Sequence, residues 1–75
     1  MSVQFSDHAL SQLKSRKISQ EKVIATVKNP RRKFKSFKNR MLRQKQFGSK
    51  ILEVVTAAEG SRITVIAQYY LEGDK

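Results

Sequence analysis

Three side chains of this chain are candidates for catalysis: a histidine, an arginine and a tyrosine. His8 is the single histidine, and it lies two residues after Ser6, which is a good N-cap for a helix. The positive end of the helix dipole disfavours an imidazolium, so a neutral His8 could accept a proton as general base. The alternative is structural, with His8 bonded to the loop backbone at the helix start.

Arg43 would supply positive charge to such a reaction. Arg43 and Lys45 share one face of a predicted strand, because strand side chains repeat every two residues. Two cations about 7 Å apart can bind a phosphate and stabilise the charge that develops on it. Lys33 and Lys35 repeat this spacing on the preceding predicted strand. The alternative is a solvated strand edge whose lysines deter aggregation.

Tyr70 is the aromatic candidate, near the end of the last predicted strand. Tyr69 and Tyr70 are adjacent, so they must point to opposite faces of the sheet. One ring can pack on the protein while the other stacks on a nucleobase, a contact worth about 1–3 kcal/mol. Gln68 would share a face with Tyr70. The alternative is that both rings cover the sheet edge.

A basic stretch from residue 28 to residue 50 dominates the chain. It contains ten lysines and arginines and no acid, with Phe34 and Phe37 between the charges. An unstructured basic tail would carry few large apolar residues, so we expect a folded cationic surface that faces a polyanion. The predicted nucleic-acid-binding residues are Arg31, Arg32, Lys33, Lys35, Lys38, Arg40, Lys45 and Lys50.

Composition limits the remaining chemistry. The chain has 75 residues, a formal net charge of +10 and no cysteine, and we expect a single domain over residues 1–75. Cysteine chemistry is excluded, a lone histidine disfavours a metal site, and we expect no cofactor. The start of the sequence lacks a signal-peptide pattern, and no apolar run reaches about 18 residues. A soluble cytoplasmic protein is the expectation.

The pattern of residues predicts two helices followed by four strands. Ser6 and Ser19 are good N-caps, and Asn29-Pro30 ends the second helix. The first helix is expected over residues 7–16, and the strands over residues 33–37, 41–47, 51–57 and 62–71. We allow for a bulge in the first strand, because its two phenylalanines differ in parity. The predicted fold class is α+β, with two N-terminal helices packed on a four-stranded antiparallel meander sheet.

Two segments resemble a small bacterial domain family of unknown function that is grouped with the RelE/ParE toxins. The opening match is FSDHALSQLKSRKISQEKVIATVKNP, with a His-Ala pair, then Arg, then Ile-Ser and Asn-Pro. The closing match is ILEVVTAAEGSRITVIAQYY, an apolar hairpin with a Glu-Gly turn and terminal aromatics. Together the matches span about Phe5 to Tyr70.

The resemblance implies a RelE-like fold, as in mRNA interferases, and a toxin-type endoribonuclease. In such enzymes the RNA 2′-hydroxyl attacks the adjacent phosphate, supported by basic and aromatic residues on the sheet. The expected catalytic residues are then His8, Arg43 and Tyr70. The implied partners are RNA, including ribosome-bound mRNA, and an acidic antitoxin, with no membrane partner. The protein would be a monomer or a small homo-oligomer.

Two positions bear on this resemblance. Arg16 matches the family's helix 1 arginine, and we expect a structural role, with its head bonded to a strand or to the C-terminus. Glu53 departs from the family pattern, which usually has a basic residue there, and it is expected to pair with Arg43 or Arg62. This carboxylate favours an alternative, a non-catalytic basic nucleic-acid-binding module. The same cations would also suit a protein-interaction domain of the same fold.

Overall fold

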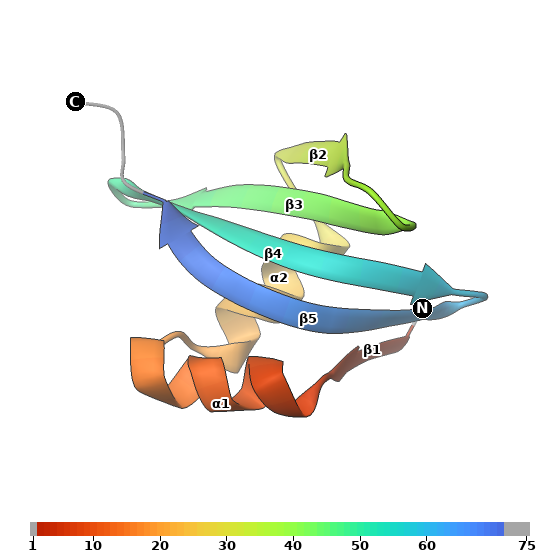
Figure 1. Ribbon diagram of the computed structural model, residues 1–75. Coiled ribbons are helices and arrows are strands. Elements are labelled where there is room, and N and C mark those ends of the chain that lie inside the picture. Colours follow the sequence, from red (N-terminus) through yellow and green to blue (C-terminus); the bar gives the residue numbers. More distant parts are fainter. Residues whose placement is uncertain (1, 72–75) are drawn as a thin grey trace.

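A five-stranded mixed sheet carries two helices on one of its faces (Figure 1). The computed structural model describes residues 2–71. The elements are β1 (Ser2–Phe5), α1 (Asp7–Arg16), α2 (Gln20–Lys28), β2 (Arg32–Lys35), β3 (Arg40–Phe47), β4 (Lys50–Glu59) and β5 (Arg62–Leu71). The strand order is β1-β5-β4-β3-β2, so β1 and β2 are the edge strands. No helix within residues 2–71 is long and apolar enough to cross a membrane.

Serine caps start both helices, as the sequence predicts. Ser6 Oγ accepts a hydrogen bond from Ala9 N, and Ser19 Oγ accepts one from Lys22 N. Each bond satisfies a backbone N–H of the first turn that has no partner within the helix. α1 ends at Arg16, and the C-cap residue Lys17 has a φ of 54°, in the left-handed region. The expected helix over residues 7–16 is therefore confirmed.

The prediction of four antiparallel strands preceded by two helices is wrong in one respect, because β1 comes before α1. β1 pairs in parallel with β5, with Val3 opposite Ile63 and Phe5 opposite Val65. Val3 and Phe5 pack against the core, whereas Gln4 between them is exposed. So short an alternation does not distinguish a strand from the chain leading into a helix, and its partner lies at the other end of the sequence.

The strands from β2 to β5 form the expected antiparallel meander. Lys38 and Asn39 form the turn between β2 and β3 with φ values of 62° and 60°, a conformation that Asn tolerates better than most residues. β2 ends before Phe37, so the parity conflict disappears and the expected bulge in this strand is wrong. The irregularity lies instead at Val55 and Thr56 of β4, in its pairing with β5.

The hydrophobic core lies between the helices and the sheet. α1 packs on β5, and α2 packs on β4 and β3. The core residues come from the helical region and from β4 and β5: Ala9, Ile18, Val23, Val27, Leu52, Val54, Ile63 and Val65. Because side chains alternate along a strand, the neighbours of Leu52 and Val54 point to the other side of the sheet. Neither helix covers that side, which we call the open face (Figure 1).

The open face consists of residues in register across four strands, β2, β3, β4 and β5. One row is polar and contains Arg32, Gln44, Glu53 and Tyr69. The next row is apolar and contains Phe34, Leu42, Val55 and Ala67. Polar and apolar side chains therefore run side by side across the open face.

Candidate nucleic-acid interface

The segment from Arg31 to Arg40 forms one positively charged edge of the molecule. Every residue in it is exposed, and its strand, β2, is an edge strand of the sheet. The segment contains no acid. It carries six of the predicted nucleic-acid-binding residues, which we call the cationic edge: Arg31, Arg32, Lys33, Lys35, Lys38 and Arg40.

The strand residues of the cationic edge divide between the two sides of the sheet. Lys33 lies opposite Arg43 on the helix side, and Lys35 shares its parity. Arg32 and Arg40 have the other parity and belong to the open face. A polyanion that follows this edge therefore meets cations whichever side of the sheet it approaches from.

Two phenylalanines accompany the charges. Phe34 is 43% exposed and belongs to the apolar row of the open face, while Phe37 in the turn is 73% exposed. Large aromatic side chains are buried in most folded proteins. Exposed rings between phosphate-binding cations are the arrangement on which unpaired bases stack.

Arg43 and Lys45 share the helix side of β3, as predicted, but they bind the protein itself. Arg43 Nη1 donates to Val27 O at 3.0 Å, and its Nε donates to Thr56 Oγ1 at 3.2 Å. Lys45 Nζ donates to Asn29 O at 3.0 Å. The Val27 and Asn29 carbonyls lie at the C-terminal end of α2. The last carbonyls of a helix have no hydrogen-bond partner within it, and the partial negative charge there attracts cations. Burial lowers the pKa of the Arg43 guanidinium from its ordinary value.

The three predicted catalytic residues lie on different elements and are not brought together. His8 is exposed in the first turn of α1, which packs on β5. Arg43 is bonded to the end of α2. Tyr70 packs against the core on the helix side, with Lys50 Nζ 5.3 Å from the centroid of its ring. Strand β4 lies between the strands that carry Arg43 and Tyr70.

A hydrogen-bonded network on the open face was not predicted from the sequence. Gln44 Nε2 donates to Glu53 Oε1 at 2.6 Å, and the Tyr69 hydroxyl donates to Glu53 Oε2. Glu53 is only 8% exposed. Tyr69 lies on the open face and Tyr70 on the helix side, so the predicted opposite orientation of these rings is confirmed. The register of the two hairpins, which places these residues in one row, is the signal that could have revealed the network.

The expected pairing of Glu53 with Arg43 or Arg62 is wrong. Arg43 lies opposite Val54 and points to the helix side, whereas Glu53 points to the open face. Arg62 lies opposite Glu59, at the other end of β4. Glu53 therefore accepts hydrogen bonds from the neutral side chains of Gln44 and Tyr69, which are its neighbours on the two adjacent strands.

The same network changes the acidity of Tyr69. Burial, the hydrogen bond to Glu53 and the negative charge of Glu53 raise the pKa of Tyr69 to about 12, against a lowering effect of Arg16. The Arg16 guanidinium carbon lies 6.0 Å from the centroid of the Tyr69 ring. This contact fits the structural role expected for Arg16. At neutral pH the Tyr69 hydroxyl is therefore a proton donor that holds the Glu53 carboxylate.

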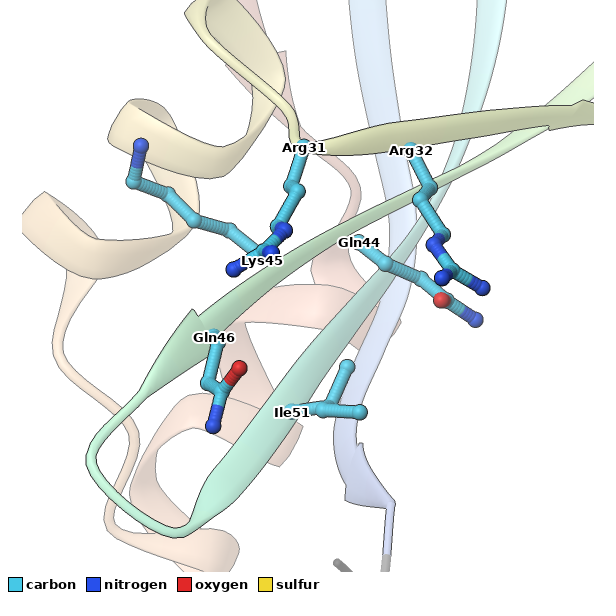
Figure 2. Close-up of a pocket in the computed structure, with 6 residues that line it drawn as sticks. All are labelled: Arg31, Arg32, Gln44, Lys45, Gln46 and Ile51. Atoms are coloured by element: carbon cyan, nitrogen blue, oxygen red, sulfur yellow. The ribbon is translucent and has the colours of Figure 1, made fainter.

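A pocket lies at each end of the cationic edge. The first has a volume of about 210 Å³ and is lined by Arg31, Arg32, Gln44, Lys45, Gln46 and Ile51 (Figure 2). The second, of about 380 Å³, is lined by Lys35, Ser36, Asn39, Arg40, Met41 and Ala58. The structure therefore brings Arg31, Arg32 and Lys45 of the prediction to one pocket, and Lys35 and Arg40 to the other. Lys50 lies apart, beside Tyr70.

Comparison with known proteins gives a family but no function. A family model described as a domain of unknown function, DUF4258, matches residues 5–70. No curated protein and no solved structure matches the chain. The match agrees with the expected family of unknown function, and the link to the RelE/ParE toxins stays a prediction.

Proposed function

We propose that this chain, which belongs to the DUF4258 family, is a binding module for single-stranded nucleic acid. The observation that carries the proposal is the cationic edge, whose six lysines and arginines are all exposed. Lysine and arginine that neutralise phosphates release counterions, and this release supplies most of the sequence-independent affinity for nucleic acid. The bound strand would follow β2 and extend onto the open face.

The exposed apolar surface beside these charges favours a single strand over a duplex. Phe34 continues into the row formed with Leu42 and Val55 on the open face. A duplex hides its bases inside the stack, whereas a single strand can lay them on aromatic and apolar side chains. A purely electrostatic contact would need the cations alone and would leave Phe34 and Phe37 without a role.

The dependence of affinity on salt tests the electrostatic part of the proposal. The dissociation constant of fluorescent oligo(U) is measured by anisotropy at several NaCl concentrations. If five cations contact phosphates on a single strand, the logarithm of the association constant, which is the reciprocal of that dissociation constant, should fall with log[NaCl] with a slope of roughly −3.5. Substituting Lys33→Gln together with Lys35→Gln should bring the slope closer to zero by about 1.4. A wild-type slope near zero would remove the nucleic-acid proposal.

A matched pair of variants tests the aromatic part. Phe34 and Leu10 are both 43% exposed, but Phe34 is on the open face and Leu10 is on α1. Phe34→Ala should weaken oligo(U) binding by roughly 5- to 150-fold, the range expected for one lost base stack of about 1–3 kcal/mol. Leu10→Ala also removes exposed apolar surface, but away from the proposed path of the bound oligonucleotide, so it should leave oligo(U) affinity unchanged. Equal losses in both variants would contradict stacking at Phe34.

RNA cleavage stays a prediction that the arrangement of residues does not favour. His8 is exposed and free to meet an RNA, but Arg43 is bonded to α2 and Tyr70 packs on the core. Incubation of the purified protein with RNA, with and without ribosomes, separates cleavage from binding. If cleavage occurs, His8→Ala should slow it on the order of a hundredfold. An acidic protein partner would compete with oligo(U) for the cationic edge, and the anisotropy assay would detect that competition.

A further inference from the structure

We propose that the pocket at the start of β2 is a ribonucleotide subsite that distinguishes RNA from DNA. The proposal rests on the proposed binding of single strands, which the cationic edge alone would provide for either nucleic acid. In this pocket Arg31 and Arg32 bind neighbouring backbone phosphates, and the side-chain oxygen of Gln44 accepts a hydrogen bond from the 2′-hydroxyl of the ribose between them.

The pocket forms because β2 is shorter than β3. The last pair between the two strands is Arg32 with Gln44, and Arg31 N donates to Gln44 O at 2.8 Å. β3 continues to Phe47 beyond this pair. The neighbouring side chain of Gln46 bonds the Gly48 carbonyl at 3.0 Å. The end of the sheet therefore leaves a hollow beside β3 in place of another strand pair.

Two guanidinium groups provide the anion-binding part of the pocket. Figure 2 shows the side chains of Arg31 and Arg32 diverging from the start of β2, with the tip of Arg31 beside Lys45 and the tip of Arg32 beside Gln44, while Ile51 also lines the pocket. The Lys45 ammonium is turned away and donates to Asn29 O, so the available charge belongs to the two arginines. The guanidinium fork matches the geometry of phosphate oxygens. Ile51 offers an apolar surface to the ribose between the two phosphates.

A chain of hydrogen bonds fixes the acceptor in the pocket. The Glu53 carboxylate accepts from Gln44 Nε2 through one oxygen and from the Tyr69 hydroxyl through the other. A carboxylate offers no donor, so the Gln44 amide must direct its nitrogen to Glu53. Its oxygen then remains as an acceptor among the lining groups of the pocket. Glu53 is thus a positioning residue for Gln44.

The ribose 2′-hydroxyl matches this combination of donors and acceptor. RNA carries a hydroxyl donor beside each backbone phosphate, whereas DNA has no donor at that position. A site with two guanidinium groups and one fixed acceptor therefore loses a bond with DNA and leaves the Gln44 oxygen unpaired. Binding of the phosphate itself is the same for both strands.

The test compares oligo(U) with oligo(dU), which differ only in the 2′-hydroxyl. The full chain should bind oligo(U) roughly fivefold more tightly at the same salt concentration, as expected for one hydrogen bond. Gln44→Leu should reduce this ratio to about 1, with most of the change in oligo(U) affinity. Gln46→Leu, at the other glutamine of the pocket, should keep the ratio. Arg31→Ala should weaken both oligonucleotides equally.

A measurement on the wild-type protein avoids reliance on the folding of the variants. In NMR titrations the side-chain amide signals of Gln44 should shift further with oligo(U) than with oligo(dU). Equal wild-type affinities for the two strands, or a ratio that survives Gln44→Leu in a folded variant, would overturn the subsite while binding of single strands stands. If neither strand binds, the proposed function fails together with the subsite.

Discussion

The chemistry of single residues is clearest at Tyr69, whose hydroxyl is held by Glu53 on the open face. The pKa of this phenol is raised from 10.0 to about 12. In the unfolded chain the phenol loses its proton near pH 10, so between about pH 10 and 12 the folded state binds more protons than the unfolded state. Stability from this group is complete below pH 10 and is lost as the pH rises towards 12.

Tyr69→Phe should therefore remove the late part of the phenolate titration. Absorbance near 295 nm reports the ionisation of each tyrosine, and in the wild-type chain Tyr69 is expected to ionise in a late step at about pH 12. The variant should lose that step while its fold is retained. The step is measured in folded protein, as judged by circular dichroism at each pH. If both titration curves have the same late step, Glu53 does not hold the hydroxyl.

For the residues of this network, the sequence predicts which face of a strand each side chain occupies but not which side chains are neighbours. The sequence correctly placed Tyr69 and Tyr70 on opposite faces, because adjacent residues of a strand alternate. It could not place Gln44, Glu53 and Tyr69 in one row, because that requires the register of two hairpins. A single residue of slip would move Glu53 to the helix side. Its expected arginine partners were wrong for the same reason.

Among the elements, the end of α2 depends on cations contributed by β3. Arg43 and Lys45 donate to carbonyl oxygens there, Arg43 from a half-buried position. Their spacing predicted a shared face, which the structure confirms, but spacing alone does not say what lies opposite that face. The C-terminal end of a helix carries partial negative charge and unpaired carbonyls. The end of a helix can therefore bind cations whose spacing in the sequence resembles that of a phosphate site.

Arg43→Met should consequently lower stability more than it lowers nucleic-acid binding. The substitution keeps an unbranched stem but leaves the Val27 carbonyl and the Thr56 hydroxyl without a bond from the guanidinium. The free energy of unfolding should fall by about 1.5–3 kcal/mol, measured by urea denaturation. Oligo(U) affinity of the folded variant should change less than twofold. A variant of wild-type stability with greatly weakened binding would return Arg43 to the nucleic-acid site.

The elements themselves were largely predictable, with β1 as the exception. Serine caps and apolar periodicity located both helices, and β-branched residues located β4 and β5. β1 has four residues and a parallel partner, β5, from the far end of the chain. No local pattern encodes such a pairing. Only the completed β4–β5 hairpin creates the edge that β1 occupies.

For the molecule as a whole, the net charge of +10 is expected to lower the stability of the fold and to raise its affinity for nucleic acid. Like charges crowded on the cationic edge repel one another in the folded state, and salt screens that repulsion. Raising NaCl from about 0.05 to 0.5 M should therefore raise Tm by roughly 2–6 °C. The same salt weakens the binding of nucleic acid.

Differential scanning calorimetry of the wild type and of the Lys33→Gln, Lys35→Gln double variant measures this effect. The double variant should melt at a higher temperature in low salt and show a smaller rise with NaCl, because it carries two fewer positive charges on the same edge. A wild-type Tm that falls with NaCl would show that attractive pairs, and not repulsion, dominate the electrostatics of the fold.

The parallel pairing of β1 with β5 also constrains how the chain can fold during synthesis. The partners of Val3 and Phe5, Ile63 and Val65, are translated last among the core residues. Until they leave the ribosome, the apolar sides of α1 and α2 have no complete sheet to cover. Folding of this domain is therefore expected to finish only after β5 has been synthesised, with β1 docking as the last step.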